Sequence, residues 1–501
     1  MIHSLVEYRD VLDKAGLLCK DTSAGCGESP VTGLTYESKK AETGTLFVCK
    51  GAAFKKEYLL EAAERGSIAY VSETDYGISL PMLQVSDIRA AMPYLARLFY
   101  RTWADEEMNL MGITGTKGKT TAAYYTRKIF DTAAEHCGTS PAAFLTSVET
   151  FDGVETISSG ITTPESFELY RHFANAFASG IRSIVCEVSS QALKYGRVDG
   201  IPFKSAVVMN ISKDHISAIE HPDFEDYFAS KLKIYGMCEN ALVNTDSPYF
   251  EECMKAASAA QRVITFGRDE KAMYRAENIR TGEDCTSFTL VFEGEAYPFT
   301  LEMSGEFNVE NALAAIALAH LSGIDFAVMQ EALKNAAVPG RVEKYATADG
   351  RIKAVVDYAH NAYSFRKMFE MARSLWPESR LVTVFGCPGS KAVNRRKDLG
   401  ETAGKYCDFI YLTADDPAKE ELSDICAEVG QYIEKEGCPY VVVPDREDAI
   451  RRAVFEAECE TAVLILGKGC ETTQIEKNGK VPYPSDASVL RDCIAMYNER
   501  A

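Results

Sequence analysis

The sequence predicts an α/β protein built from three domains. Strand-like and helical segments alternate through residues 106–338 and again through 339–501, which is the pattern of parallel sheets covered by helices. A glycine-rich stretch, TGTKGKTT, stands between a strand-like and a helical segment at residues 114–121. At 501 residues the chain is also too long for one hydrophobic core. We therefore expect a small α/β domain at 1–105, followed by two doubly wound domains at 106–338 and 339–501.

The first block contains short strand-like runs separated by turns, with a helical pattern at Tyr58–Arg65. The strand candidates are GTLFVCKG (44–51), SIAYVSE (67–73) and MLQVSD (82–87).

The second block alternates strands with helices and ends in a hairpin. SFTLVFEGEAYPFTLEM (287–303) alternates at period two around a glycine turn, which predicts two antiparallel strands. A helical stretch follows at Val309–Leu321. The parallel strand candidates are MNLMGIT (108–114), IRSIVCEVS (181–189), KSAVVMNIS (204–212), NALVNTD (240–246) and RVITFG (262–267).

The third block begins at PGRVE (339–343) and repeats the βα alternation, as expected of a Rossmann-like doubly wound domain. Its strand candidates are IKAVVDYA (352–359), RLVTVFG (380–386), DFIYLTA (408–414), YVVVPD (440–445) and TAVLILG (461–467).

Composition restricts the partners. The formal charge is 54 − 73 = −19, so the surface repels phosphate backbones and nucleic acid is an unfavourable partner. The N-terminus lacks the basic and apolar regions of a signal peptide, and no apolar run approaches membrane-spanning length. The 15 cysteines form no CxxC pair. We expect buried thiols in a cytoplasmic protein that contacts no membrane.

The glycine-rich stretch is typical of a phosphate-binding loop. Its backbone amides can converge on an anion, and the helix that follows adds the positive end of its dipole. Lys119 can reach the outer phosphates, and the Thr120 hydroxyl can ligate Mg²⁺. The strict P-loop pattern has a glycine five places before Gly118, where this chain has Ile113. An ordinary glycine-rich turn is the alternative, but the flanking strand and helix favour phosphate.

The spacing TGTxGKT resembles the ATP loop of the Mur ligases and the folylpolyglutamate synthetases, which join a carboxylate to an amine. The match begins at Thr114, and Lys117 stands where many members carry asparagine. The resemblance implies ATP binding through Gly115, Thr116, Lys117, Gly118, Lys119, Thr120 and Thr121.

CEVSSQAL places Glu187 at the end of an apolar strand, where parallel sheets present ligands. A carboxylate there can hold Mg²⁺ against ATP phosphates, although a solvated strand-end acid is the simpler reading of the motif alone. The segment resembles the EVSS segment of the Mur ligases, with Gln191 replacing the usual histidine. The resemblance implies that the muramoyl substrate contacts Thr162, Thr163, Ser190 and Arg197.

Two more segments match family positions near the metal ions. In NISKDH, the resemblance places Asn210 near the nucleotide and His215 at the second metal. DYFASKLKIY matches the motif whose lysine, here Lys231, is carbamylated by CO₂. Carbamylation would turn an ammonium into a carboxylate ligand. The implied metal ligands are thus Thr120, Glu187, His215 and Lys231, with Lys119, Glu187, His215 and Lys231 serving catalysis.

Later motifs extend the resemblance over nearly the whole chain. GEFNVENALAA, VPGRVE and DYAHNA imply nucleotide contacts from Asn308, Asn311, Arg341, Asp357 and His360, although Asn at a helix start is often only a cap. TGLTYESKKAETGTLFVCKG resembles the uridine-binding first domain of the branch that adds the third amino acid, with Ser38 contacting the substrate. The folate branch lacks that domain.

The acceptor amino acid is predicted from two groups of residues. Arg396 matches the arginine that clamps the α-carboxylate, although RRK could be a solvated basic run. Diaminopimelate-adding members carry DNPR where this chain has DDPA, so Ala418 replaces the arginine for a second carboxylate. A distal ammonium would instead be favoured by the acidic pocket. L-lysine is the expected acceptor, ornithine and meso-diaminopimelate are the alternatives, and Lys419 could stand in for the missing arginine. The expected pocket residues are Asp415, Asp416, Gly467 and Glu471.

The resemblance therefore implies a monomeric ATP- and Mg²⁺-dependent ligase acting on a UDP-N-acetylmuramoyl dipeptide in peptidoglycan synthesis. Its D-glutamate would be activated as an acyl phosphate and attacked by the diamino acid. A P-loop kinase or NTPase and a non-catalytic nucleotide-binding scaffold are the more distant alternatives.

Overall fold

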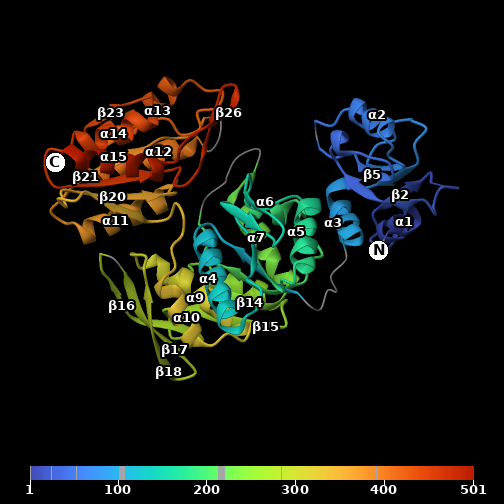
Figure 1. Cartoon of the computed structure of the whole chain (residues 1–501), viewed down its shortest axis with the longest axis horizontal. Helices are drawn as coiled ribbons and strands as arrows, with labels where there is room; N and C mark the ends of the chain where they lie inside the picture. Colours follow the sequence, from blue (N-terminus) through green and yellow to red (C-terminus); the bar gives the residue numbers. More distant parts are fainter. Residues whose placement is uncertain are drawn as a thin grey trace. The chain divides into compact units, whose positions relative to one another are not determined.

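The computed structural model describes residues 2–23, 25–51, 53–100, 108–212, 220–283, 285–389 and 393–500 (Figure 1). His215 lies outside these ranges. Within them, no helix combines the length and apolar composition that crossing a bilayer requires. All 15 cysteines are unpaired, but Cys19, Cys26, Cys137 and Cys459 are exposed, so the expectation of buried thiols is wrong for these four. The chain divides into two compact units: Met1–Ile211, Phe228–Met273 and Ala314–Val328 form the first, and Ser212–Tyr227, Tyr274–Leu313 and Met329–Ala501 form the second.

The first unit begins with a five-stranded sheet in the order β2-β7-β6-β5-β4, in which only β2 is antiparallel to its neighbour. The predicted strands and the predicted helix are confirmed. The elements are β1 (His3–Ser4), α1 (Leu5–Lys14), β2 (Leu18–Asp21), β3 (Pro30–Val31), β4 (Gly33–Thr35), η1 (Ser38–Lys40), β5 (Thr45–Val48), α2 (Lys56–Glu64), β6 (Ala69–Ser72), β7 (Met82–Val85) and α3 (Ile88–Tyr100).

The second sheet of this unit runs in the order β11-β10-β9-β12-β8-β13-β14-β15. In that order, β9 and all the strands after it are parallel to one another. All five predicted parallel strands are present. The elements are β8 (Asn109–Thr114), α4 (Lys119–Cys137), β9 (Ala143–Leu145), β10 (Glu149–Phe151), β11 (Thr156–Ser158), α5 (Ser166–Ala178), β12 (Ser183–Glu187), α6 (Ser190–Lys194), β13 (Phe203–Val208), α7 (Phe224–Leu232), η2 (Lys233–Met237), β14 (Cys238–Asn244), α8 (Phe250–Ala257) and β15 (Arg262–Gly267).

The second unit contains the predicted hairpin, widened to three antiparallel strands by β16. The turn is Glu293–Gly294, where Gly294 has a φ of 86°. The elements are β16 (Tyr274–Thr281), β17 (Thr286–Phe292), β18 (Glu295–Leu301), α9 (Phe307–Leu321) and α10 (Phe326–Lys334); α9 and α10 each contain residues of both units.

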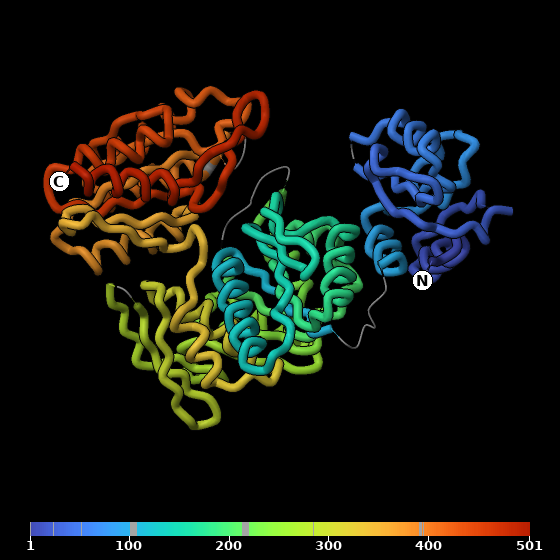
Figure 2. Tube along the Cα trace, in the orientation of Figure 1, coloured from blue at the N-terminus to red at the C-terminus, as the bar shows by residue number. Residues whose placement is uncertain are grey.

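The C-terminal sheet has the order β19-β20-β24-β21-β22-β23, parallel except for the edge strand β19. Figure 2 traces this part of the chain from orange to red. Alternate residues of its strands face opposite layers: Val382 and Val384 pack in the core that includes α14 and α15, whereas Phe385 contacts Phe365 of α11. The predicted double winding is confirmed, and the boundaries at 105 and 338 stay predictions. The elements are β19 (Glu343–Ala346), β20 (Ile352–Asp357), α11 (Ala362–Leu375), β21 (Arg380–Phe385), α12 (Asn394–Tyr406), β22 (Phe409–Leu412), α13 (Leu422–Glu436), β23 (Tyr440–Val442), α14 (Arg446–Phe455), β24 (Thr461–Leu466), β25 (Thr473–Glu476), β26 (Gly479–Pro482) and α15 (Asp486–Arg500).

Candidate active site

The glycine-rich loop follows β8 and leads into α4 as predicted. Gly115 has a φ of 148°, and a Cβ there would lie 2.8 Å from the Met209 Cβ. Gly118, at the start of α4, also has a positive φ, of 86°. Only glycine adopts such backbone readily, so these residues allow the loop to turn sharply at a helix N-terminus. Thr116, Thr120 and Thr121 are buried along it.

Asn210 braces this loop from the neighbouring strand. In the parallel pairing of β13 with β8, Val208 lies beside Thr114. The residues that follow the two strands therefore lie close together. The Asn210 Oδ1 atom accepts a hydrogen bond from the Lys117 amide at 2.9 Å, and its Nδ2 donates to the Lys117 carbonyl at 3.1 Å. The Thr116 amide donates to the Asn210 carbonyl at 2.8 Å. The structure thus places Asn210 at the glycine-rich loop and gives it a supporting role there.

Two lysines converge on one loop carbonyl. The Lys119 Nζ donates to the Gly115 carbonyl at 2.9 Å, and the Lys231 Nζ donates to the same oxygen at 2.9 Å. Lys231, at the end of α7, is 2% exposed. These lysines are 112 residues apart in the sequence, and the fold brings them to one glycine-rich loop.

Thr120 and Glu187 meet at Ser147. β12 pairs with β8 in parallel, with Glu187 beside Ile113, so the carboxylate lies at the end of the sheet that carries the loop. The Glu187 Oε1 accepts from the Ser147 amide at 3.1 Å, and the Thr120 Oγ1 lies 3.2 Å from the Ser147 Oγ. A hydroxyl and a buried carboxylate are hard oxygen ligands, so this donor set fits Mg²⁺.

The predicted muramoyl-contacting residues also gather at the end of β12. The Thr163 Oγ1 donates to the Glu187 carbonyl at 2.9 Å, and the Arg197 Nη1 donates to the Thr163 carbonyl at 3.2 Å. Arg197 forms an ion pair with Glu165 at 3.0 Å, and its buried Nε has no hydrogen-bond partner among the described residues. Ser190 begins α6 and is buried, and Thr162 is half-buried.

Three other predicted residues make local hydrogen bonds. The Ser38 hydroxyl donates to Glu61 at 2.6 Å. Asn308 and Asn311 lie in the first turns of α9, where the Asn308 Nδ2 donates to the Ser304 carbonyl at 2.9 Å and the Asn311 Nδ2 to the Asn308 Oδ1 at 3.3 Å. These bonds suit helix-start residues, and the nucleotide and substrate contacts stay predictions.

In the second unit, Arg341, Asp357 and His360 surround Tyr358. The Asp357 carboxylate accepts hydrogen bonds from the amides of Val342 at 2.9 Å and Ala359 at 2.7 Å. The Arg341 guanidinium lies 4.5 Å from the centre of the Tyr358 ring, and the His360 Nδ1 lies 2.8 Å from the Tyr358 carbonyl oxygen. The nucleotide contacts expected of Arg341, Asp357 and His360 stay predictions.

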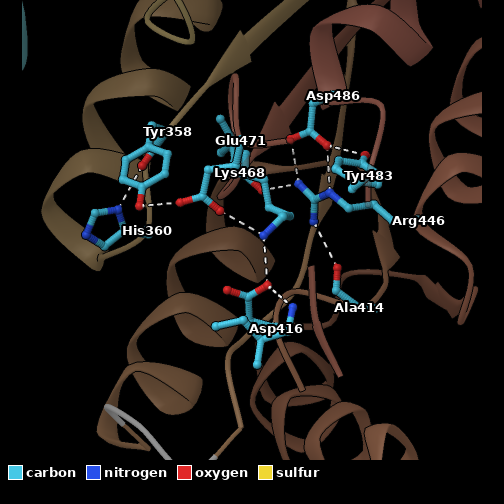
Figure 3. A network of polar contacts seen from close by, with 11 residues as sticks. Tyr358, His360, Ala414, Asp416, Arg446, Lys468, Glu471, Tyr483 and Asp486 are labelled. Atoms are coloured by element: carbon cyan, nitrogen blue, oxygen red, sulfur yellow. Dashed lines mark hydrogen bonds and ion pairs between the residues drawn. The ribbon is translucent and has the colours of Figure 1, made fainter. Parts of the chain in front are cut away.

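The Tyr358 hydroxyl connects this group to the acceptor pocket. It donates to Glu471 Oε1 at 2.8 Å, and the other oxygen of that carboxylate accepts from the Lys468 Nζ at 2.8 Å (Figure 3). The same Nζ donates to Asp416 Oδ1 at 2.8 Å. Burial alone would lower the pKa of Lys468, but the negative charges of nearby Asp415, Glu471 and Asp416 raise it.

Asp415 completes the acidic pocket beside Gly467. A Cβ on Gly467, which has a φ of 120°, would lie 2.5 Å from Asp415 Oδ2, so only glycine lets the two loops approach. Burial raises the pKa of Asp415 to about 6, against the opposing charges of Lys468 and Arg446. Three predicted carboxylates are therefore together, as expected, around a lysine that sequence reasoning did not assign.

Arg446 connects the two loops that contain Asp415 and Gly467. It is paired with Asp486 at 2.7 and 2.8 Å, and Asp486 accepts from the Tyr483 hydroxyl at 2.6 Å. The guanidinium also donates to the carbonyls of Ala414, at 3.1 Å, and Leu466, at 2.9 Å, just before Asp415 and Gly467 (Figure 3). Nothing in the sequence around Arg446 marks it, because its role depends on tertiary packing.

Arg396 is held by carboxylates of its own chain. Its two terminal nitrogens bind Glu420 at 2.8 and 2.7 Å, and the Nη1 also donates to Glu428 at 2.7 Å. The side chain is 3% exposed, and its buried Nε has no hydrogen-bond partner among the described residues. The sequence alternative of a solvated basic run is wrong for Arg396. Its Nε edge can receive a carboxylate, and that role stays a prediction.

Comparison with known proteins identifies the family. A model described as the Mur ligase middle domain matches residues 113–319, and one described as Mur ligase, glutamate ligase domain matches residues 340–469. A protein of Enterococcus faecalis (strain ATCC 700802 / V583) named UDP-N-acetylmuramoyl-L-alanyl-D-glutamate--L-lysine ligase is 36% identical, with 99% of this chain and 100% of the relative covered. A UDP-N-acetylmuramyl-tripeptide synthetase of Bifidobacterium longum (strain NCC 2705) is 36% identical, with 92% of each covered.

Solved structures share the fold. A UDP-N-acetylmuramoyl-L-alanyl-D-glutamate--2,6-diaminopimelate ligase has a TM-score of 0.68 at 23% identity, with 99% of each chain covered. A MurF ligase of Thermotoga maritima in complex with ADP has a TM-score of 0.60 at 17% identity, with 94% of this chain and 97% of that chain covered. Together with the near full-length relatives, these matches establish that the chain belongs to the Mur ligase family.

Proposed function

We propose that this chain is an ATP-dependent ligase that joins L-lysine to the D-glutamate of UDP-N-acetylmuramoyl-L-alanyl-D-glutamate, in the cytoplasmic phase of peptidoglycan synthesis. Two relatives at 36% identity carry that name, and the matches cover 99% and 90% of this chain. The observation that carries the choice of lysine is the acidic pocket, in which Asp415, Asp416 and Glu471 gather and Ala418 offers no positive charge.

The phosphates of ATP would bind the amides of Gly115–Thr121 at the start of α4. Mg²⁺ held by Thr120 and Glu187 would withdraw charge from the phosphates during transfer. Lys119 can turn from the Gly115 carbonyl to a phosphate oxygen. Lys231 would contribute to the same site once CO₂ carbamylates its amine, and intact mass measured with and without bicarbonate tests this modification.

The chain's own residues then organise two chemical steps. Arg197, Thr163 and Ser190 would orient the muramoyl dipeptide so that its D-glutamate γ-carboxylate attacks the γ-phosphoryl group, which breaks the bond to the β-phosphate and releases ADP. The resulting acyl phosphate turns the carboxyl oxygen into a leaving group. The lysine α-amine attacks the carbonyl carbon, and phosphate departs. Lys119 would stabilise the charge on the phosphoryl oxygens in both steps.

The pocket favours a distal ammonium over a distal carboxylate. A carboxylate placed beside Asp415 would be repelled, and an unpaired buried charge costs several kcal/mol. Lys419, the proposed stand-in for the missing arginine, is exposed. Ornithine presents the same charge on a shorter chain, so it is the closest competitor. A kinase or NTPase would not need a pocket that binds the distal ammonium of an amino acid.

Phosphate release tests the proposal directly. We would measure it with muramoyl dipeptide plus lysine, ornithine or meso-diaminopimelate at saturating ATP. We expect lysine to give the highest kcat/KM, and no release without the dipeptide. Preference for meso-diaminopimelate would refute the charge argument, and release independent of both substrates would support an NTPase.

A further inference from the structure

The Lys468 ammonium group is buried among the acidic residues that are proposed above to bind the distal ammonium of the acceptor amino acid. Its side chain is 0% exposed and lies in the turn after β24, between Gly467 and Gly469. The Nζ is 2.8 Å from Asp416 Oδ1 and 2.8 Å from Glu471 Oε2 (Figure 3). The figure shows the group pointing between the two carboxylates.

Both of these carboxylates are also fixed by other donors. Asp416 Oδ1 accepts from the Ile475 amide at 2.9 Å, and Glu471 Oε1 accepts from the Tyr358 hydroxyl at 2.8 Å. Asp416 is held in a backbone conformation with a φ of 48°. A charged hydrogen bond from Lys468 therefore joins two loops whose carboxylates would otherwise repel each other.

Asp415 differs from its two acidic neighbours. In the part of the chain that the structure describes, no group donates a hydrogen bond to its carboxylate. With Lys468 counted, the three carboxylates leave a net charge of −3 + 1 = −2. One added cation would reduce the net charge further, whereas an added anion would increase it.

We propose that Lys468 is a specificity-determining positioning residue: its ammonium holds Asp416 and Glu471 in place and leaves Asp415 to pair with the distal ammonium of the acceptor. Two of the three N–H bonds of Lys468 are directed at Asp416 and Glu471, whose combined negative charge exceeds its own, so Lys468 is not a free countercharge for an acceptor carboxylate. This inference rests on the proposed function and adds a residue to it.

The first test replaces Lys468 by methionine, which keeps the length of the side chain without its charge. We expect K468M to raise the lysine KM about tenfold to a hundredfold, the range for losing a charged hydrogen bond, and to leave the ATP KM within about twofold. K477M is the matched control, because Lys477 and Glu421 form an ion pair in which both side chains are mostly exposed. An unchanged lysine KM in K468M would overturn the inference.

Restoring the positive charge chemically distinguishes a positioning role of the Lys468 ammonium from a packing role of the side chain. K468C treated with 2-bromoethylamine regains an ammonium at nearly the original length, and ethylation supplies a neutral control. Wild-type protein treated identically controls for the 15 other cysteines. We expect only the aminoethylated variant to recover the lysine KM. Equal recovery by the neutral adduct would show that Lys468 only fills space.

A second pair of variants does not require changing Lys468. We expect D415N to raise the lysine KM more than D416N, because the amide oxygen that D416N introduces can still accept from Lys468 and Ile475. The reverse order would overturn the inference. If wild-type phosphate release does not depend on lysine, the proposed function itself fails; if it does and these variants behave otherwise, only the role of Lys468 fails.

Discussion

Asp415 and Asp416 are adjacent in sequence but lie in different electrostatic surroundings. Asp416 shares the Lys468 ammonium and the Ile475 amide, whereas burial raises the pKa of Asp415 to about 6. Sequence reasoning found both acids because they lie in DDPA, the segment that stands where diaminopimelate-adding members carry DNPR. It could not separate their roles, because the separation is made by a lysine from another loop.

The raised pKa of Asp415 predicts a pH dependence. Below about pH 6 the carboxyl is protonated and cannot attract an ammonium, so kcat/KM for lysine should fall as the pH drops through about 6. For stability the sign is opposite: because the folded pKa exceeds the ordinary 3.8, the free energy of unfolding should decrease as the pH rises from 3.8 to about 6. Urea unfolding and lysine kinetics across this range check both trends. D415N should reduce this slope, and an unchanged slope in the variant would contradict the assignment.

Arg396 makes a second prediction about single residues. R396M leaves Glu420 and Glu428 without their shared cation, so it should lower the free energy of unfolding by about 1–3 kcal/mol and raise the lysine KM. The triple variant R396M/E420Q/E428Q removes the unpaired charges and should regain most of the stability in urea unfolding. We expect its lysine KM to stay high, because the partner of the α-carboxylate is still missing. Recovery of lysine affinity in the triple variant would contradict the clamp.

At the level of elements, the long buried strands were predictable and the short exposed ones were not. β8 and β12 are apolar runs that end in polar residues, so the sequence placed Glu187 at a strand end; Asn210 follows β13, which ends at Val208, and was placed near the nucleotide by the resemblance. β11 is exposed throughout, β26 is mostly exposed and β25 is mostly half-buried, so none shows a hydrophobic period. The β25–β26 hairpin nevertheless holds the acceptor loop, since the Ala418 amide donates to the Ile475 carbonyl at 2.9 Å.

The turn between β8 and α4 gives a prediction for one element. G115A places a Cβ 2.8 Å from the Met209 Cβ at a φ of 148°, so it should cost about 1–3 kcal/mol of stability and raise the ATP Kd at least about tenfold. Gly138, which ends α4 with a φ of 65° and has open space around its Cβ position, supplies the control. Calorimetry should find that G138A lowers Tm but leaves the ATP Kd unchanged. Equal ATP Kd values in the two variants would contradict a phosphate-binding role for the loop.

At the level of the whole molecule, the sequence predicted the α/β class, the parallel central sheet and the double winding of the C-terminal sheet. The strand pattern placed Glu187, because parallel strands present their carboxyl ends at one edge of the sheet, whereas the grouping of the other site residues came from the resemblance to the Mur ligases. It did not predict Ser147, Arg446 or Lys468, which act by connecting one loop to another. Such residues have no local pattern, and only the fold reveals their partners.

The central claim is that this chain activates a carboxylate by phosphorylation before an amine replaces the phosphate. Its most direct test uses muramoyl dipeptide labelled with ¹⁸O in the D-glutamate γ-carboxylate, with ATP, Mg²⁺ and lysine. Mass spectrometry of the released phosphate should find one ¹⁸O atom for each lysine-containing product formed, because the transferred phosphoryl group leaves with a carboxylate oxygen. Unlabelled phosphate accompanying product formation would contradict the account.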